Sequence, residues 1–140
     1  MKVLWFTDLH LDSADRHHKD RRQVDALLFN ALSQENAKGE VGAIWLTGDI
    51  SNGKMLRKHL TRLSSAFSGT PIYLVLGNHD YWHSKGPTES REEYLSLVES
   101  IPGVTWLTQS NPVQFGPQTW LCGVDGWGDL GHCDGENGGA

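Results

Sequence analysis

The stretch Ile72-Tyr73-Leu74-Val75-Leu76-Gly77-Asn78-His79-Asp80 decides how this chain folds. Its first five residues are apolar and show no polar alternation, which is typical of a strand buried on both faces of a sheet. Its last four residues can turn the chain, bind a metal ion or transfer a proton. The stretch therefore predicts a buried strand that ends at a chemically active site.

Two earlier stretches repeat this arrangement of an apolar run followed by polar residues. Val3-Leu4-Trp5-Phe6-Thr7 leads into Asp8-Leu9-His10, and Ala43-Ile44-Trp45-Leu46-Thr47 leads into Gly48-Asp49. In open α/β sheets, ligands bind at the carboxyl ends of the strands. We therefore expect the three strand ends to meet at one site.

Segments with helical apolar spacing separate these runs. The expected helices span about residues 20–38, 53–67 and 89–100. The expected apolar stripe of the first is Val24, Leu27, Leu28, Ala31 and Leu32, and that of the second is Leu56, Leu60, Leu63 and Phe67. The expected strands span residues 2–7, 41–47, 72–76, 104–107, 113–115 and 119–124. The order β-α-β-α-β-α, followed by a β-rich part, predicts an α/β fold with a largely parallel sheet.

Length, charge and cysteine content restrict the class of protein. The 140 residues suit one domain, which we place at 1–130, and the Gly-rich residues 131–140 are expected to form a disordered tail. The formal net charge of −5 disfavours long nucleic acid as a partner. No segment is typical of a signal peptide or a membrane span. The two cysteines, Cys122 and Cys133, lack zinc-site spacing and predict reduced thiols in a cytoplasmic protein.

The polar strand ends carry side chains that bind metal ions. Asp8 and His10 are two residues apart, so they lie on one face of an extended chain, and Asp49 and Asn78 offer further oxygen ligands. Bringing Asp8, Asp49 and Asp80 together without a cation would raise their carboxyl pKa values, and a bound metal removes that cost. Each motif alone arises by chance or serves a turn or cap. All three in order favour a metal centre.

These residues carry a family resemblance. Asp8-Leu9-His10, Gly48-Asp49 and Gly77-Asn78-His79-Asp80 resemble the first three signature blocks of the calcineurin-like metallophosphoesterases, over roughly residues 1–85. The resemblance implies a two-layer β-sandwich flanked by helices, with a dinuclear metal centre at the strand ends. Asp8 and His10 would bind the first metal, Asp49 would bridge both, and Asn78 would bind the second. The metals implied are Mn, Fe, Zn or similar.

The resemblance also implies roles in catalysis for the end of the third block. His79 would lie beside the leaving-group oxygen as general acid or charge stabiliser, and Asp80 would orient His79 through a hydrogen bond. Tyr81 and Trp82 follow at once. Either of two interpretations suits this pair: a wall of the substrate mouth, or aromatic packing on the loop.

The chain departs from the family pattern after residue 85. The family continues with another histidine ligand and a Gly-His-x-His block, whereas this chain offers only His132, a candidate ligand or an exposed tail histidine. We therefore expect either a sandwich that is incomplete at its C-terminal end or a compact variant with an unusual site. Missing strands would expose apolar surface and an unpaired edge, which predicts self-association. The turn Asp125–Asp129 receives no catalytic role.

Two functions stay open from the sequence. The first is a hydrolase, a metal-dependent phosphatase or phosphodiesterase acting on phosphomonoesters or phosphodiesters through two divalent metal ions. The alternative is a truncated or non-catalytic metal-binding remnant of the same fold, suggested by the missing histidines. Metal content distinguishes them, because the enzyme requires about two metals per chain and the remnant would hold one or none.

Overall fold

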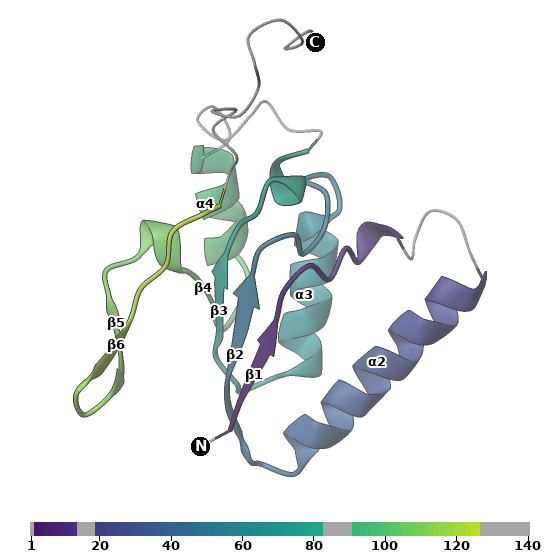
Figure 1. Ribbon diagram of the computed structural model, residues 1–140, viewed down its shortest axis with the longest axis horizontal. Coiled ribbons are helices and arrows are strands. Elements are labelled where there is room, and N and C mark those ends of the chain that lie inside the picture. Colours follow the sequence, from purple (N-terminus) through teal and green to yellow (C-terminus); the bar gives the residue numbers. More distant parts are fainter. Residues whose placement is uncertain (1, 14–18, 83–90, 127–140) are drawn as a thin grey trace, which may run out of the picture.

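The computed structural model describes residues 2–13, 19–82 and 91–126 (Figure 1). Its strands are β1 (Lys2–Phe6), β2 (Val41–Thr47), β3 (Ile72–Val75), β4 (Val104–Trp106), β5 (Val113–Gly116) and β6 (Thr119–Leu121). Its helices are α2 (Lys19–Ala37), α3 (Leu56–Ala66), α4 (Arg91–Glu99) and the 3₁₀ turns η1 (His79–Tyr81) and η2 (Leu107–Gln109). The alternation of strands and helices expected from the sequence is confirmed.

Four strands form a parallel sheet in the order β1-β2-β3-β4, and β5 and β6 form a separate antiparallel pair. Because all four strands run the same way, their carboxyl ends lie along one edge of the sheet (Figure 1). The three polar motifs follow β1, β2 and β3, which are neighbours in the sheet. Their meeting at one edge therefore results from the strand order.

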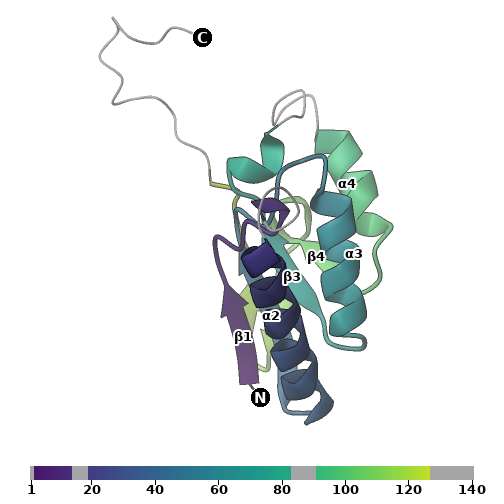
Figure 2. The ribbon, with the colours of Figure 1, turned by 90° about the vertical axis from the view of Figure 1, so that its right-hand side faces the viewer.

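The hydrophobic core lies between one face of the sheet and the helices (Figure 2). Alternate residues of β2 and β3 point into it and are fully buried, as in Ile44, Leu46 and Leu74. The stripe of α3 that the sequence predicts is buried against them. Its members are Leu56, Leu60, Leu63 and the adjoining Phe67. These contacts hold the strands that carry the polar ends.

The expected apolar stripe of α2 is only partly confirmed. Leu27, one of its predicted members, is 68% exposed, whereas Phe29 is buried. The Arg62 guanidinium of α3 lies 3.7 Å from the centroid of the Phe29 ring. Because α2 contacts α3 along this line, Phe29 rather than Leu27 faces the neighbouring helix.

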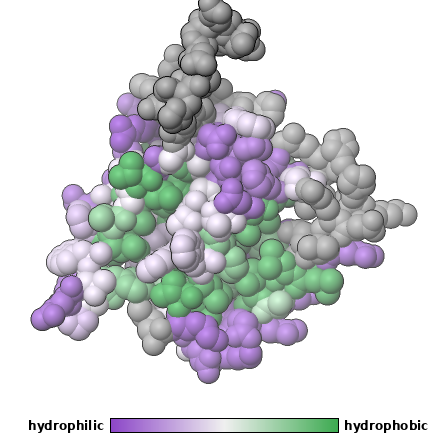
Figure 3. All heavy atoms as spheres, viewed as in Figure 1, coloured by the Kyte–Doolittle hydropathy of each residue, from purple (hydrophilic) through white to green (hydrophobic). Residues whose placement is uncertain are grey.

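The opposite face of the sheet is covered by the β5–β6 hairpin. The ring of Phe115 lies with its centroid 5.6 Å from that of Trp45 and 6.2 Å from that of Tyr73. Trp5 of β1 pairs in register with Trp45, but it lies beyond the hairpin and is 68% exposed. Figure 3 shows apolar residues gathered across the middle of one face, between hydrophilic regions.

We predict that this chain self-associates through β1, which pairs with only one of the described strands. An edge strand leaves backbone donors and acceptors unpaired, and the exposed Trp5 adds apolar surface beside it. Trp5→Lys should shift the chain toward the monomer in sedimentation velocity. Trp120→Lys, at an exposed tryptophan of the hairpin, is the matched control. A wild-type chain that stays monomeric as its concentration rises would contradict this prediction.

The remaining predictions concern membrane-spanning helices and the C-terminal tail. Among the described helices, none combines the length and apolarity needed to cross a membrane. The predicted tail at 131–140 and the candidate ligand His132 lie outside the described residues.

Candidate metal centre

Backbone pairing beyond the ends of β1 and β2 brings the first two motifs side by side. The Asp8 amide donates to the Gly48 carbonyl at 3.1 Å, and the His10 amide donates to the Asp49 carbonyl at 2.9 Å. The two segments therefore stay in register after the regular strands have ended. This contact confirms that the first two strand ends meet.

Asp8, His10 and Asp49 all have left-handed backbone conformations, with φ of 54°, 43° and 51°. Among the described residues other than glycine, no others have positive φ. Such a conformation costs an L-residue roughly 1–2 kcal/mol, and strained residues of this kind cluster at functional sites. The strain here falls on three of the four predicted metal ligands.

This backbone conformation leads to a testable order of stabilities. We expect His10→Gly to be more stable than His10→Ala by about 1 kcal/mol, because glycine has no Cβ to clash at positive φ. Urea denaturation of the metal-free proteins would measure the difference. Thr47, in the regular strand β2, is the control position, where the alanine variant should be more stable than the glycine variant. Equal stability of the two His10 variants would argue against the left-handed assignment.

Two glycines allow the ends of β2 and β3 to approach each other. A Cβ built on Gly48 would lie 3.2 Å from the backbone of Gly77. A Cβ built on Gly77 would lie 2.2 Å from Asp49 Oδ1 and 2.7 Å from the Asp49 amide nitrogen. Gly77 is therefore required less for a turn than for the room that the Asp49 carboxylate occupies.

The three motifs each place one residue in a group of candidate metal ligands, His10, Asp49 and His79. One potential ligand atom from each lies within 4.8 Å of the others. Nε2 of His10 is 3.8 Å from Asp49 Oδ2, and the rings of His10 and His79 meet edge to face with centroids 4.4 Å apart. Asp49 Oδ1 also accepts a hydrogen bond from the His79 amide at 3.0 Å. Asp49 therefore contacts both histidines of the group.

The other two predicted ligands, Asp8 and Asn78, are exposed and take part in local hydrogen bonds. Asp8 is exposed, its carboxylate accepts a hydrogen bond from the Thr7 hydroxyl, and it falls outside the group found among the described residues. Asn78 is also exposed, and its carbonyl accepts a hydrogen bond from the Tyr81 amide at 3.2 Å. The structure thus brings together His10 and Asp49 of the predicted ligands. It adds His79, which the sequence assigned to the leaving group.

The hydrogen bond predicted from Asp80 to His79 is not among the contacts of the described residues, in which the Asp80 carboxylate bonds to backbone amides instead. Asp80 is fully buried, and its two oxygens accept hydrogen bonds from the amides of Ser51 and Gly77, each at 2.9 Å. The η1 turn directs Asp80 inward and leaves His79 partly exposed. Burial raises the pKa of Asp80 to about 7, against the opposing effect of these amide bonds. Asp80 thus connects the segment after β2 to the segment after β3.

Tyr81 and Trp82, the aromatic pair after Asp80, differ in their surroundings. Trp82 is 46% exposed, and its ring centroid lies 3.4 Å from that of His79, with an interplanar angle of 31°. Tyr81 is buried and packs edge to face on Tyr94 at 5.1 Å. Trp82 therefore forms the wall beside His79, and Tyr81 serves the packing of the loop. A stacked ring, rather than a carboxylate, restrains the His79 side chain.

Sequence reasoning missed three polar residues that support the site. Ser51 Oγ and His59 Nδ1 are 2.7 Å apart, and both residues are buried. This contact ties the segment after Asp49 to α3. His59 lies on the apolar face of α3, three positions after Leu56 and four before Leu63, so its spacing could have revealed it. The third residue, Asp125, lies in the segment after β6, to which no catalytic role was assigned.

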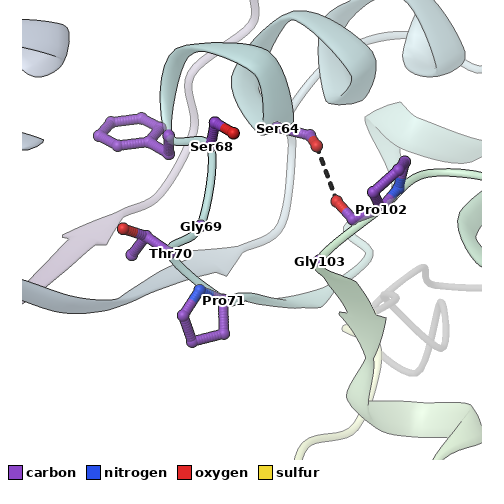
Figure 4. Close-up of a pocket in the computed structure, with 8 residues that line it drawn as sticks. Ser64, Ser68, Gly69, Thr70, Pro71, Pro102 and Gly103 are labelled. Atoms are coloured by element: carbon purple, nitrogen blue, oxygen red, sulfur yellow. Dashed lines mark hydrogen bonds between the residues drawn. The ribbon is translucent and has the colours of Figure 1, made fainter.

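A surface pocket lies at the other end of the sheet, where β3 begins (Figure 4). Uncharged residues line it, most of them small, and Ser64 Oγ donates a hydrogen bond to the Pro102 carbonyl at 2.7 Å. No side chain in its lining titrates near neutral pH or binds metals well. The pocket is therefore separate from the candidate metal centre.

The fold and the strand-end group together are those of an α/β protein with a candidate metal centre at the carboxyl ends of its parallel strands. The chain belongs to the calcineurin-like phosphoesterases, since the model of that family matches residues 1–132. A comparison with curated proteins gave no match. The family consists of phosphoester hydrolases that generally use divalent metal ions, which agrees with the resemblance of the three motifs.

Proposed function

We propose that this chain hydrolyses a phosphomonoester or phosphodiester at a dinuclear metal centre. The observation that supports this most is the convergence of His10, Asp49 and His79, one residue from each strand end, within 4.8 Å. Left-handed strain at His10 and Asp49 supports it further, because the fold retains an unfavourable backbone at these positions.

The metal-binding set that we propose is Asp8 and His10 for one ion and Asn78 for the other, with Asp49 shared between them. Carboxylate, imidazole and amide oxygen together suit Mn, Fe or Zn. Two such ions would polarise the phosphate oxygens and activate water for attack. Asp49 suits the shared position because it lies between His10 and the His79 amide.

His79 supplies the proton chemistry of the proposed reaction. Its ring is partly exposed beside Trp82, so it can reach a substrate oxygen from the mouth of the site. A positioned histidine that gives a proton to a leaving alkoxide accelerates the reaction by about 10²–10⁴-fold. The indole of Trp82 fixes the plane of the imidazole and covers one side of it.

The proposal is tested by turnover of a chromogenic phosphomonoester and a chromogenic phosphodiester. We expect turnover with added Mn²⁺, loss of turnover after chelation, and about two metals per chain. The phosphoester that is turned over identifies the substrate class. A folded chain that binds metal but shows no turnover would support the alternative, a non-catalytic remnant, which the position of Asp8 outside the ligand group favours.

The composition of the chain bears on the size of the substrate and on the cellular location. The net charge of −5 disfavours long nucleic acid as substrate, so a smaller phosphoester is the proposed partner. A cytoplasmic location stays a prediction from the cysteines, of which Cys122 is exposed as a free thiol.

A further inference from the structure

The carboxylate of Asp125 accepts hydrogen bonds from four donors, which lie in two separate parts of the chain, residues 76–81 and 106–108. Oδ1 accepts from the Leu76 amide at 2.7 Å, Trp106 Nε1 at 2.9 Å and the Thr108 hydroxyl at 2.7 Å, and Oδ2 accepts from the Tyr81 hydroxyl at 2.8 Å. Hydrogen bonds to an ionised acceptor are shorter and roughly twice as strong as neutral ones. A single side chain after β6 thus joins segments far apart in the sequence.

Two of these donors lie at the two ends of the motif loop, Gly77–Asp80. Leu76 directly precedes the loop and Tyr81 directly follows it. The Gly126 amide also donates to the Leu76 carbonyl at 3.1 Å, so both backbone groups of Leu76 bond to this segment. The motif loop is therefore closed at its base by one carboxylate.

The other two donors attach Asp125 to the protein core. Trp106 is buried in the core cluster, and Thr108 lies in η2, which follows β4. The Tyr81 hydroxyl remains a donor, because burial and then its bond to Asp125 raise the pKa of Tyr81. The carboxylate of Asp125 thus connects both ends of the motif loop to the core.

We propose that Asp125 is a positioning residue for the metal centre, which holds the motif loop so that Asn78 and His79 lie at the strand ends. This inference rests on the proposed function for the site that the loop serves. The ordinary alternative is a turn-stabilising carboxylate whose loss would weaken the whole domain. The two alternatives predict faster hydrogen exchange in different parts of the protein when Asp125 is replaced.

Hydrogen exchange of the full metal-free chain locates that change. Asp125→Ala should raise exchange in a peptide covering Leu76–Trp82 by about tenfold or more, with α3 unchanged. Asp125→Asn should restore protection, because its oxygen can still accept from Leu76 and its amide can donate to the Tyr81 oxygen. Thr108→Val is the matched control, because it removes one donor to the same carboxylate without touching the loop.

A second readout tests positioning of the metal ligands. Co²⁺ should bind Asp125→Ala roughly 10–100-fold more weakly than wild type, with a changed visible spectrum, whereas Thr108→Val should match wild type. If Asp125→Ala fails to fold, Tyr81→Phe is the second variant. It removes only the hydrogen bond that follows the motif loop, so hydrogen exchange should rise at that end of the loop alone.

Several results would overturn the inference. One is a hydrogen exchange that rises equally throughout the Asp125→Ala protein, and another is an Asp125→Ala protein that behaves like Thr108→Val. A third is a Tyr81→Phe protein whose exchange at the motif loop is unchanged. Absence of Mn²⁺-dependent turnover in the wild type would instead refute the proposed function. The exchange comparison would still decide whether Asp125 positions the loop, because it needs no metal or substrate.

Discussion

Asp49→Ala is expected to abolish metal-dependent turnover, with a loss of at least ~10³-fold. Replacing a residue that only supports a metal ligand already costs about 10–100-fold, and Asp49 is the central carboxylate of the group. The same substitution removes the acceptor of the His79 amide, so His79 would also lose part of its restraint. The effect should fall on kcat and on metal affinity together.

Two variants separate charge from shape at this position. Asp49→Asn keeps an oxygen that can accept from the His79 amide but removes the negative charge, so it should stay folded and still lose metal. Glu40→Ala is the control, because it removes an exposed carboxylate at the amino end of β2. Its turnover should match that of the wild type.

The measurements are initial rates with saturating Mn²⁺ and metal content after purification. A folded Asp49→Ala protein that keeps its metals and its turnover would exclude Asp49 as a ligand. Loss of turnover with unchanged metal content would indicate instead that Asp49 acts on the substrate. Circular dichroism confirms that each variant is folded before its rates are compared.

Gly77→Ala is the second substitution with a large expected effect. The added Cβ would meet the Asp49 carboxylate at 2.2 Å and the Asp49 amide nitrogen at 2.7 Å. The carboxylate can rotate away, but the amide belongs to the backbone and cannot. We therefore expect a loss of roughly 1–3 kcal/mol in the free energy of unfolding and the displacement of Asp49 from His10 and His79. Metal affinity and turnover should fall with it.

Gly116→Ala is the matched control for this substitution. A Cβ on Gly116 would meet Thr119 only at 3.5 Å, which is ordinary contact, and the position lies in the hairpin. Its stability and metal binding should be close to wild type. A Gly77→Ala protein with wild-type metal affinity would show that the two strand ends can separate without loss of the site.

Much of the fold could be predicted from local sequence. Apolar runs before Asp8, Asp49 and Asn78 predicted β1, β2 and β3, because strand burial and helical periodicity are both encoded over a few residues. The meeting of the three ends also followed from the sequence, since alternating strands and helices favour a parallel sheet. Leu27 was misjudged because helical spacing shows an apolar stripe but not where the neighbouring helix touches it.

The supporting contacts of the site were beyond such reasoning. Asp80 was expected at the His79 ring, yet the η1 turn places its carboxylate on backbone amides from two loops. Asp125 bonds to Tyr81 across 44 positions of sequence, and no local pattern specifies such a partner. Backbone amides carry no sequence signature, so their acceptors become evident only once the chain is folded.

The sequence alone determined where the strands lie and which strand ends carry residue types that can bind metal ions. Residue type sets what a side chain can bind, and apolar runs set where the strands lie. Only the tertiary structure decided how these residues are held: His79 by Trp82, the β2 and β3 loops by Asp80, and the motif loop by Asp125. The physical reason is that hydrogen bonds and ring contacts depend on distances between segments, which chain order does not specify.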